Sequence, residues 1–271
     1  MAVLPGDFRI KEGMFLTDEH WKVLQPVLEP PPAPRRGRPW KDGRAILEAI
    51  FFVLHTGIQW EHLPQSFPPK STVHDRLQLW SGNQAFRQLL AKVVRSLAQK
   101  GRIDLDQCFV DATFAPAKGG GEGVGLTKKG KGTKLQLIVD GQGLPLGASA
   151  AAANVAEWHM VQQTLDLFSD QTPPRRLIGD KAYDCDELDE TLAELGLEMI
   201  APHRKNRRPE NRTQDGRPLR RYRHRWIVER TFAWLGARRR LLVRWEKKLT
   251  NYVGFTLLGC LSLLLQRLHH A

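Results

Sequence analysis

The sequence predicts an α/β protein in which an all-helical N-terminal region, residues 1–100, precedes a mixed domain over residues 101–271. Two observations lead to this prediction. Apolar residues recur at helical spacing up to about residue 100, and short apolar runs separated by turn signals follow from there. At 271 residues and 41% apolar content, the chain is also long enough to bury a substantial core.

The N-terminal region contains three segments with helical periodicity. Thr17 is a candidate N-cap for "LTDEHWKVLQPVL", and Gly57 stands where "DGRAILEAIFFVLHTG" should end. After the turn-rich "HLPQSFPPK", Ser71 is a candidate N-cap for "STVHDRLQLW". The order helix, turn, helix indicates a region of the helix-turn-helix type, although most helical hairpins bind no DNA.

Polar residues at the start of the last of these helices favour DNA binding, because recognition helices contact phosphates and base edges there. The candidates are Lys70, Ser71, Thr72, His74 and Arg76. Upstream, Arg36 and Arg38 in "RRGRP" suit a short arm in a narrow minor groove, and a basic linker is an equal alternative.

The charge balance favours a polyanionic partner. The net charge is +12, and residues 201–250 hold 17 Lys and Arg but only four acidic residues. A solvated face or a basic loop is the alternative interpretation of such a run. Trp226, Phe232 and Trp234 recur within it at helix-like intervals, so part of the run must pack.

The remaining bulk features indicate a cytoplasmic protein. The three cysteines are scattered and lack CxxC spacing, which favours neither disulfides nor zinc. The start "MAVLPGDFRI" has no apolar signal region. The apolar segment from Tyr252 to Arg267 is shorter than the roughly 18 to 20 residues of a membrane span, so we expect a buried C-terminal helix and no membrane partner.

The order of elements after residue 103 predicts a ribonuclease H-like domain. Three strands are expected in "QCFVDATF", "KLQLIVD" and "LPLGASAA", with "DGQG" as a turn. A helix over 154–168, the strand "RRLIGD", a helix over 186–195, the strand "LEMIAP" and the helix containing "RWIVERTFAWL" follow. The Gly- and Lys-rich "APAKGGGEGVGLTKKGKGTK" is expected to be a flexible loop. The order β-β-β-α-β-α-β-α requires a partly parallel sheet.

Three acidic residues fall on three elements of that order. Asp111 interrupts an apolar strand, which is costly unless the carboxylate is paired or ligates a metal. Asp180 ends the fourth strand, which should lie beside the first. Glu229 lies on the last helix, with Arg225 one turn earlier to neutralise or orient it. Oxygen donors suit Mg²⁺ or Mn²⁺, and two such ions roughly 3.5 to 4 Å apart activate a water or 3′-hydroxyl for phosphodiester displacement.

Ordinary structural roles compete with this hypothesis. A strand-end Asp is more often a turn former or cap, and a helical Glu beside an Arg is usually a surface pair. Asp184 rivals Asp180, but its position favours the N-cap of the following helix. Lys181 is either a phosphate contact or part of the loop lining.

The sequence resembles the DDE transposases of bacterial insertion sequences, in particular the fifth insertion-sequence family. The resemblance runs from "LTDEHWKVLQPVL" through "GRPWKDGRAILEAIFFVLHTGIQWEHLP" to "FVDATF", and its most specific motifs are "LIGDKAYD" and "RHRWIVERTFAWLGARRRLLVRWEKK". It implies that Asp111, Asp180 and Glu229 are the acidic triad, each a ligand of two divalent metal ions. Tyr222, Arg225 and Glu229 match the family signature around the third acid, but Gly236 replaces its Lys, so that Arg238 or Arg239 is left to hold DNA.

The resemblance further implies an enzyme that binds the terminal inverted repeats of its element, cuts at the ends and joins 3′-hydroxyls to target DNA. It also implies a dimer or larger assembly on double-stranded DNA, in the bacterial cytoplasm and associated with the nucleoid. Two alternative functions remain open for the same fold. One is a non-catalytic DNA-binding repressor, and the other is a structure-selective, metal-dependent nuclease.

Overall fold

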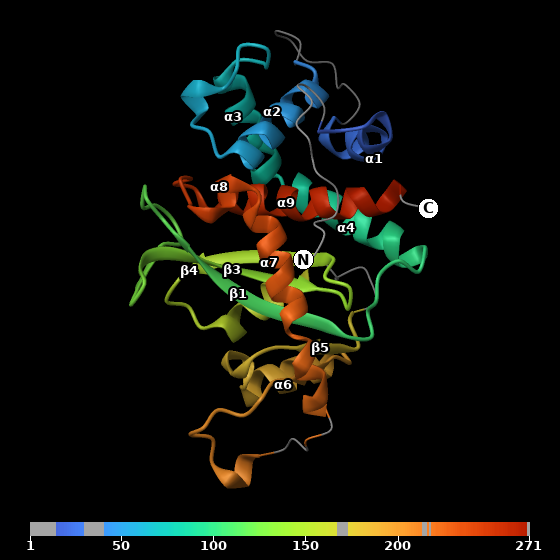
Figure 1. The fold of residues 1–271 in the computed structure, drawn as a ribbon, viewed down its shortest axis with the longest axis vertical. Coiled ribbons are helices and arrows are strands. Elements are labelled where there is room, and N and C mark those ends of the chain that lie inside the picture. The colour runs from blue at the N-terminus through green and yellow to red at the C-terminus, as the bar shows by residue number, and fades with distance from the viewer. Residues whose placement is uncertain (1–14, 30–40, 167–172, 213–215, 217, 270–271) are drawn as a thin grey trace, which may run out of the picture.

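A six-stranded mixed sheet forms the centre of the protein, which we describe from a computed structural model (Figure 1). The structure describes residues 15–29, 41–166, 173–212, 216 and 218–269. The main path of the sheet is β2-β3-β1-β5-β6, and β4 pairs with β3. Strand bounds are β1 Cys108–Pro116, β2 Gly125–Thr127, β3 Gly130–Val139, β4 Pro145–Ala152, β5 Arg176–Ile178 and β6 Glu198–Ile200.

The strand directions confirm the predicted ribonuclease H-like order. β1 is antiparallel to β3, β3 is antiparallel to β4, and β1-β5 and β5-β6 are parallel. The tight β3-β4 connection follows from Asp140, whose carboxylate accepts from the Gln142 and Leu144 amides, and from Gly143 at φ 89°. Helices α5 Val161–Leu165, α6 Asp186–Glu194, α7 Trp226–Gly236, α8 Arg239–Leu242 and α9 Leu249–His269 surround the sheet.

The N-terminal region is helical, as predicted, with α1 Asp18–Leu28, α2 Gly43–Thr56, α3 Lys70–Gly82 and α4 Ala85–Gln99. Thr17 caps α1 in a capping box with His20, and Gly57 ends α2 in the left-handed region at φ 69°. The prediction of Ser71 as an N-cap is wrong. The N-cap position of α3 is Pro69, two residues earlier, and the helix begins at Lys70, because the fixed φ of proline suits a helix start.

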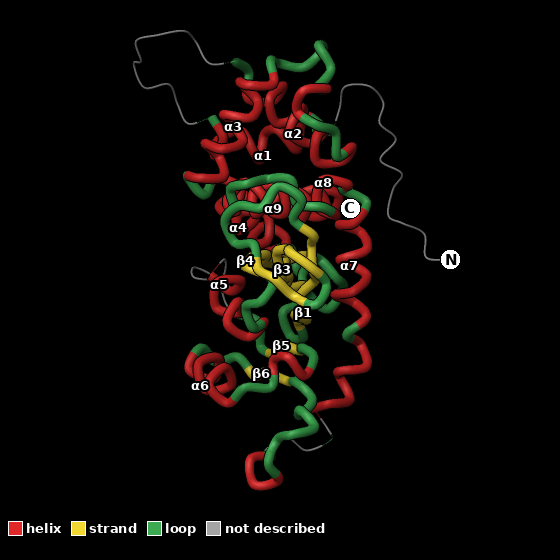
Figure 2. The backbone as a smooth tube through the Cα atoms, turned by 90° about the vertical axis from the view of Figure 1, so that its left-hand side faces the viewer, coloured by secondary structure: helices red, strands yellow, loops and turns green. Residues whose placement is uncertain are grey.

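Helix α9 lies between the N-terminal helices and the sheet (Figures 1 and 2). It contacts α3 and α4 on one side and β4 on the other. Within α9, Gly254 packs against Ser81 and Phe86, and Gly259 packs near Leu235 and Leu241. The segment is long and apolar enough to cross a membrane, but 78% of it is buried inside the protein, as the predicted C-terminal core helix requires.

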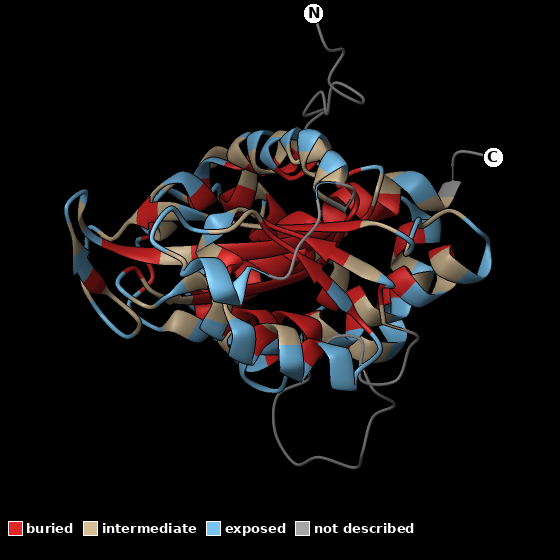
Figure 3. Ribbon diagram, turned by 90° about the horizontal axis from the view of Figure 1, so that it is seen from below, coloured by how far each residue is buried: buried red, intermediate tan, exposed pale blue. Residues whose placement is uncertain are grey.

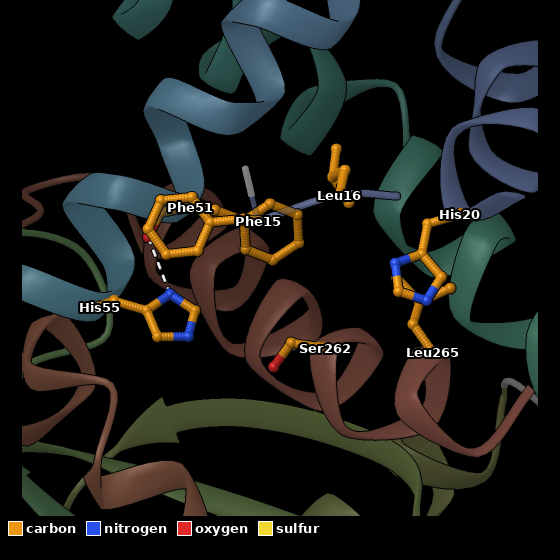
Figure 4. A pocket seen from close by; sticks show the side chains of 7 residues that line it. All are labelled: Phe15, Leu16, His20, Phe51, His55, Ser262 and Leu265. Carbon is orange, nitrogen blue, oxygen red and sulfur yellow. Dashed lines mark hydrogen bonds between the residues drawn. The ribbon is translucent and has the colours of Figure 1, made fainter. Parts of the chain in front are cut away.

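Burial is continuous across these layers. The central strands are almost wholly buried in the view from below (Figure 3), and one apolar cluster includes residues of α1 to α4, the sheet and α9. Figure 4 shows the seam between α2 and α9, where His55 Nδ1 lies 2.9 Å from the Phe51 carbonyl oxygen. The cavity there is about 10 Å³, which is the space of a single water.

Two predicted segments differ from the structure. The segment expected to be a flexible loop forms the end of β1, strand β2 and the start of β3, because the buried Arg244 guanidinium donates to the Gly123 carbonyl and to Thr133 Oγ1. The helix expected over 154–168 is shorter. It comprises η2 Glu157–Met160 and α5, and residue 168 lies outside the described residues.

Candidate active site

Strand register brings Asp111 and Asp180 to the same end of the sheet. Phe109 of β1 pairs with Ile178 of β5, and each chain continues two residues to its aspartate. Neighbouring strands lie about 4.8 Å apart, so two residues at matching levels are near neighbours. The sequence could predict this proximity because the two strands were expected to be parallel and adjacent.

The third acidic residue is connected to the first through Arg225. Its Nη1 atom lies 2.9 Å from Asp111 Oδ2, and its Nη2 atom lies 2.5 Å from Glu229 Oε1. Arg225 also stacks over the Tyr222 ring, with 5.7 Å between the guanidinium carbon and the ring centroid. Helix α7 crosses β1 and β3 (Figure 1). Arg225 and Glu229, near the start of α7, are thereby brought to Asp111. The guanidinium thus bridges two of the three predicted catalytic carboxylates.

The environment of Asp111 disfavours its charged form. Burial raises the pKa of Asp111 to about 6, against the lowering effects of the Ala112 amide and of Arg225. The negative charges of Asp180 and Glu157 raise this pKa further. A carboxylate with a raised pKa in a cluster of like charges is typical of functional sites, although structural clusters also produce it.

Asp180 and Asp184 have different local roles. Asp180 Oδ1 accepts from the Ala182 amide at 2.7 Å and thereby caps the short helix η4, Lys181–Tyr183. The prediction of Asp184 as an N-cap is wrong, because α6 begins after Cys185 without a side-chain cap. Its buried carboxylate instead accepts from His203, the Arg204 amide and Arg207. The alternative that made Asp184 a rival of Asp180 therefore loses support, since Asp184 is fully engaged.

The donor set fits a hard divalent cation. Asp111, Asp180 and Glu229 present only oxygen donors, and added positive charge would offset the burial and the repulsion from Asp180 that raise the pKa of Asp111. Within the described part of the chain, no three His, Cys, Asp or Glu side chains stand close enough to hold an ion as they lie. Arg225, which lies between Asp111 and Glu229, separates two of the donors.

The predicted DNA contacts at the start of α3 are partly accessible. Ser71 is exposed, and Lys70 is exposed but paired with Glu61. His74 is half-buried and packs edge-on against Trp60, and Thr72 is half-buried beside it in the sequence. The predicted DNA contact of Arg76 does not fit the structure, because Arg76 is only 7% exposed and lies over the Trp80 ring in the interior. The predicted minor-groove residues Arg36 and Arg38 lie outside the described residues.

Of the other predicted DNA contacts, some are exposed and one is buried. Lys181 and Arg239 are exposed. The predicted DNA contact of Arg238 does not fit the structure, because its guanidinium points into the core. There it donates to the Trp234 carbonyl at 2.6 Å and to Ser262 Oγ at 2.9 Å. Burial lowers the pKa of Arg238 to about 10. Of the two proposed substitutes for the missing Lys at Gly236, only Arg239 is therefore free to face a ligand.

Sequence reasoning missed two features of the site. Glu157, at the start of η2, contributes negative charge at both Asp111 and Tyr183, and its carboxylate lies 3.3 Å from Lys134 Nζ. Its only sequence signal was an acidic residue near the start of the helix predicted over 154–168, six residues after the third predicted strand. The second is a pocket lined by Arg220, Arg221 and Arg223, which the sequence signalled as three arginines within four residues.

Comparison with known proteins agrees with this architecture. The family model "Transposase DDE domain" matches residues 104–265, and "Putative transposase of IS4/5 family" matches residues 16–90. The first match covers more than half of the chain, including all three acidic residues. The chain therefore belongs to the DDE transposases of insertion sequences.

Individual relatives give the extent of the similarity. The chain is 34% identical over 140 residues to the "Putative transposase for insertion sequence element IS402" of Burkholderia cepacia, covering 48% of this chain and 61% of that relative. It is 32% identical over 128 residues to the "Putative transposase for insertion sequence element IS6501" of Brucella ovis, covering 47% of this chain and 94% of that relative. The chain thus spans less than two thirds of the length of the first relative.

A solved structure supports the fold alone. The piggyBac transposase in a synaptic complex with hairpin DNA superposes with a TM-score of 0.52 at 10% identity. The match covers 95% of this chain and 75% of the piggyBac chain. At 95% coverage the match takes in residues of both the helical N-terminal part and the mixed sheet.

Proposed function

We propose that this protein is a metal-dependent transposase that binds the terminal inverted repeats of its insertion sequence, cuts at the ends and joins the 3′-hydroxyls to target DNA. The observation that carries the proposal is the register that sets Asp111 and Asp180 side by side, with Glu229 held to Asp111 through Arg225. The fold alone would not carry it, because one fold hosts many activities.

Asp111, Asp180 and Glu229 are the proposed metal ligands. Two Mg²⁺ or Mn²⁺ ions held there would supply the Lewis acidity needed to activate a water or 3′-hydroxyl and to stabilise the leaving oxygen. The burial of Asp111 keeps water away from the carboxylate and strengthens its attraction for cations. Glu229 is half exposed, so its side chain is able to turn from Arg225 toward the two aspartates.

Arg225 has a separate role in this proposal. It neutralises Asp111 and Glu229 while it bridges them, and it orients both carboxylates by direct hydrogen bonds. A guanidinium released from one of these carboxylates has the planar donor geometry that binds a phosphate. Lys181, exposed beside Asp180, is positioned to contact a second phosphate.

DNA recognition is assigned to residues 1–100 and catalysis to residues 101–271. The exposed start of α3 and the net charge of +12 support binding to duplex DNA. Joining two ends to one target requires a dimer or larger assembly on that DNA. The protein would act in the bacterial cytoplasm, on the nucleoid.

The decisive experiment is cleavage and joining of a labelled duplex that carries the element's terminal repeat, in Mg²⁺ or Mn²⁺. The variants are Asp111→Ala, Asp180→Ala and Glu229→Ala, each expected to lose cutting and joining while still binding the repeat. Glu190→Ala removes an exposed carboxylate from α6 and is the matched control, which should retain activity.

The outcomes separate the rivals. Repeat binding without cutting by the metal-loaded wild-type protein would favour the repressor. Cutting without joining, on branched DNA in preference to the repeat, would favour the nuclease. Activity that survives loss of any one of the three acids would remove that residue from the proposed metal ligands.

A further inference from the structure

A cationic pocket lies beside the candidate active site. Its lining residues are Gln107, Arg220, Arg221, Arg223 and His224, and its volume is about 420 Å³. Four of these five residues belong to η6, Pro218–His224, which leads directly into α7 (Figure 1). Gln107 comes from the turn before β1 and adds an amide to the guanidinium groups.

The positive charge of this pocket has no acidic partner among the described lining residues. Among the described residues, no carboxylate lines it, and Arg220, Arg221 and Arg223 make no ion pair with an acidic side chain. Arg223 Nε does lie 3.0 Å from His224 Nε2. The acid next to Gln107 in the chain, Asp106, is taken by Arg175 and Arg176. Within the described residues, the pocket therefore concentrates positive charge without an acidic side chain to balance it.

Other basic residues of the same stretch differ in this respect. Arg207 is paired with Asp184 and Asp186, and Arg204 donates to the Lys181 and Ala182 carbonyls. Arg240 is paired with Glu246 in the interior. These arginines hold the fold together, whereas the η6 arginines face open space. Part of the positive charge of residues 201–250 is thus used inside the fold, and part of it lines the pocket.

The pocket lies a short way along β1 from the candidate catalytic carboxylate. Gln107 precedes Asp111 by four residues, which is at most about 13 Å along an extended strand. DNA rises about 3.4 Å per base pair, so this separation corresponds to roughly four base pairs. Arg225, which holds Asp111, directly follows His224 in the chain.

We propose that the η6 pocket binds backbone phosphates of duplex DNA about four base pairs from the bond that the active site cuts. The occupant rests on the proposed function, because a transposase must hold DNA on both sides of the cleaved bond. Arginine suits this role through its paired donors, and the openness of the pocket fits a polymer that passes through it. Such contacts position the duplex without reading its sequence.

The test measures binding of the full-length protein to a 30-base-pair duplex as a function of salt, by fluorescence anisotropy. The variant is Arg220→Gln, Arg221→Gln and Arg223→Gln combined. The control is Lys128→Gln, Lys129→Gln and Lys131→Gln, which removes the same charge from exposed residues of the β2–β3 hairpin, away from both the pocket and the N-terminal helices. A third protein carries Lys at all three arginine positions, which preserves the charge, and thermal melts verify that each variant is folded.

We expect the Gln variant to lower the slope of log K against log salt by about 2 to 3, because each neutralised phosphate contributes about 0.9. Affinity near physiological salt should fall at least tenfold. The Lys variant should keep the slope within about one, and the control should match the wild-type protein. Equal losses in the Gln variant and the control would overturn the proposal, since net charge alone would then explain them.

A second arm identifies the occupant. If the Gln variant keeps the DNA slope but loses binding of inorganic phosphate, measured by calorimetry, the pocket holds a small anion and the proposal fails. The function and the pocket are tested apart. A wild-type protein that never cuts DNA, but whose slope depends on the η6 arginines, would remove the transposase activity and leave the DNA contact standing.

Discussion

Asp111 is a half-buried carboxylate whose proton is held to a higher pH in the folded chain than in the unfolded chain. Burial raises its pKa to about 6 from an ordinary value of 3.8. The stability of the folded state therefore falls as pH rises between these two values, and the deficit is complete above about pH 6. Asp111 thus costs stability at neutral pH, as expected of a side chain retained for chemistry.

Asp111→Asn should therefore stabilise the protein at pH 7.5 by about 2 kcal/mol. Raising the pKa from 3.8 to about 6 corresponds to roughly 3 kcal/mol, and Asn loses some of the bond to Arg225. The gain should vanish near pH 4. Thermal melts in chelator across this range measure it, with the exposed Asp75→Asn as control. A gain that is constant with pH would show that Asp111 does not titrate as described.

The pKa of Asp184 is shifted in the opposite direction, downward, although its side chain is only 3% exposed. Burial tends to raise its pKa, but the Arg204 amide, His203 and Arg207 lower it overall. This contribution to stability is present above the unfolded pKa near 4 and is lost on acidification. The carboxylate joins the turn after Asp180 to the segment at His203.

Asp184→Ala should cost about 3 kcal/mol of unfolding free energy at pH 7, because it leaves several donors without their buried acceptor. Asp186→Ala is the matched control. The Asp186 carboxylate also contacts Arg207, but its side chain is 59% exposed. Its removal should therefore cost under about 1 kcal/mol of unfolding free energy. Urea unfolding measures both, and equal costs would contradict the role assigned to Asp184.

At the scale of elements, the hairpin formed by β2 and β3 depends on one buried arginine. Arg244, with 0% exposure, donates to Thr133 Oγ1 and to the carbonyls of Gly123, Glu246 and Lys247. Its ring contact with Tyr252 connects the same group to α9, with 5.7 Å between the guanidinium carbon and the ring centroid. A Gly- and Lys-rich segment is thereby held in order by a residue more than 100 positions away.

Arg244→Met should open this hairpin, because methionine fills part of the space but donates to none of the four acceptors. We expect trypsin to cut at Lys128, Lys129 or Lys131 about tenfold faster than in the wild-type protein. Arg239→Met, an exposed change on α8, should leave the rate unchanged. Unchanged cleavage in Arg244→Met would mean that strand pairing alone holds the hairpin.

These elements also show what the sequence could reveal. Strand order and the positions of Asp111, Asp180 and Glu229 followed from apolar runs and turn residues, which are local signals. The hairpin at β2 depends on Arg244, and the burial of Arg238 depends on α9, so both needed long-range contacts. The Arg225 bridge could be predicted only in part. Its pairing with Glu229 follows from the spacing of four residues on one helix, but its contact with Asp111 depends on a distant part of the chain.

At the scale of the whole molecule, α9 joins the two regions that the sequence separates at residue 100. Phe255 stacks near Trp60, with ring centroids 6.1 Å apart, and Gly254 meets Ser81 and Phe86. On its other side α9 packs on β4. The C-terminal helix therefore completes the core of the N-terminal helices, and helices that begin the chain depend on residues that end it.

A fragment of residues 1–100 should consequently fail to fold by itself. Without α9, Phe86 and Trp60 would lose their contacts with Gly254 and Phe255, and the loss of this apolar burial outweighs the marginal stability of a small helical domain. We expect weak helical circular dichroism and no cooperative thermal transition, whereas the full chain should melt in one transition. The matched control joins residues 1–100 to residues 249–269 through a flexible linker, which should restore helicity. A fragment that melts cooperatively without α9 would instead make residues 1–100 an independent domain, able to bind DNA apart from the catalytic sheet.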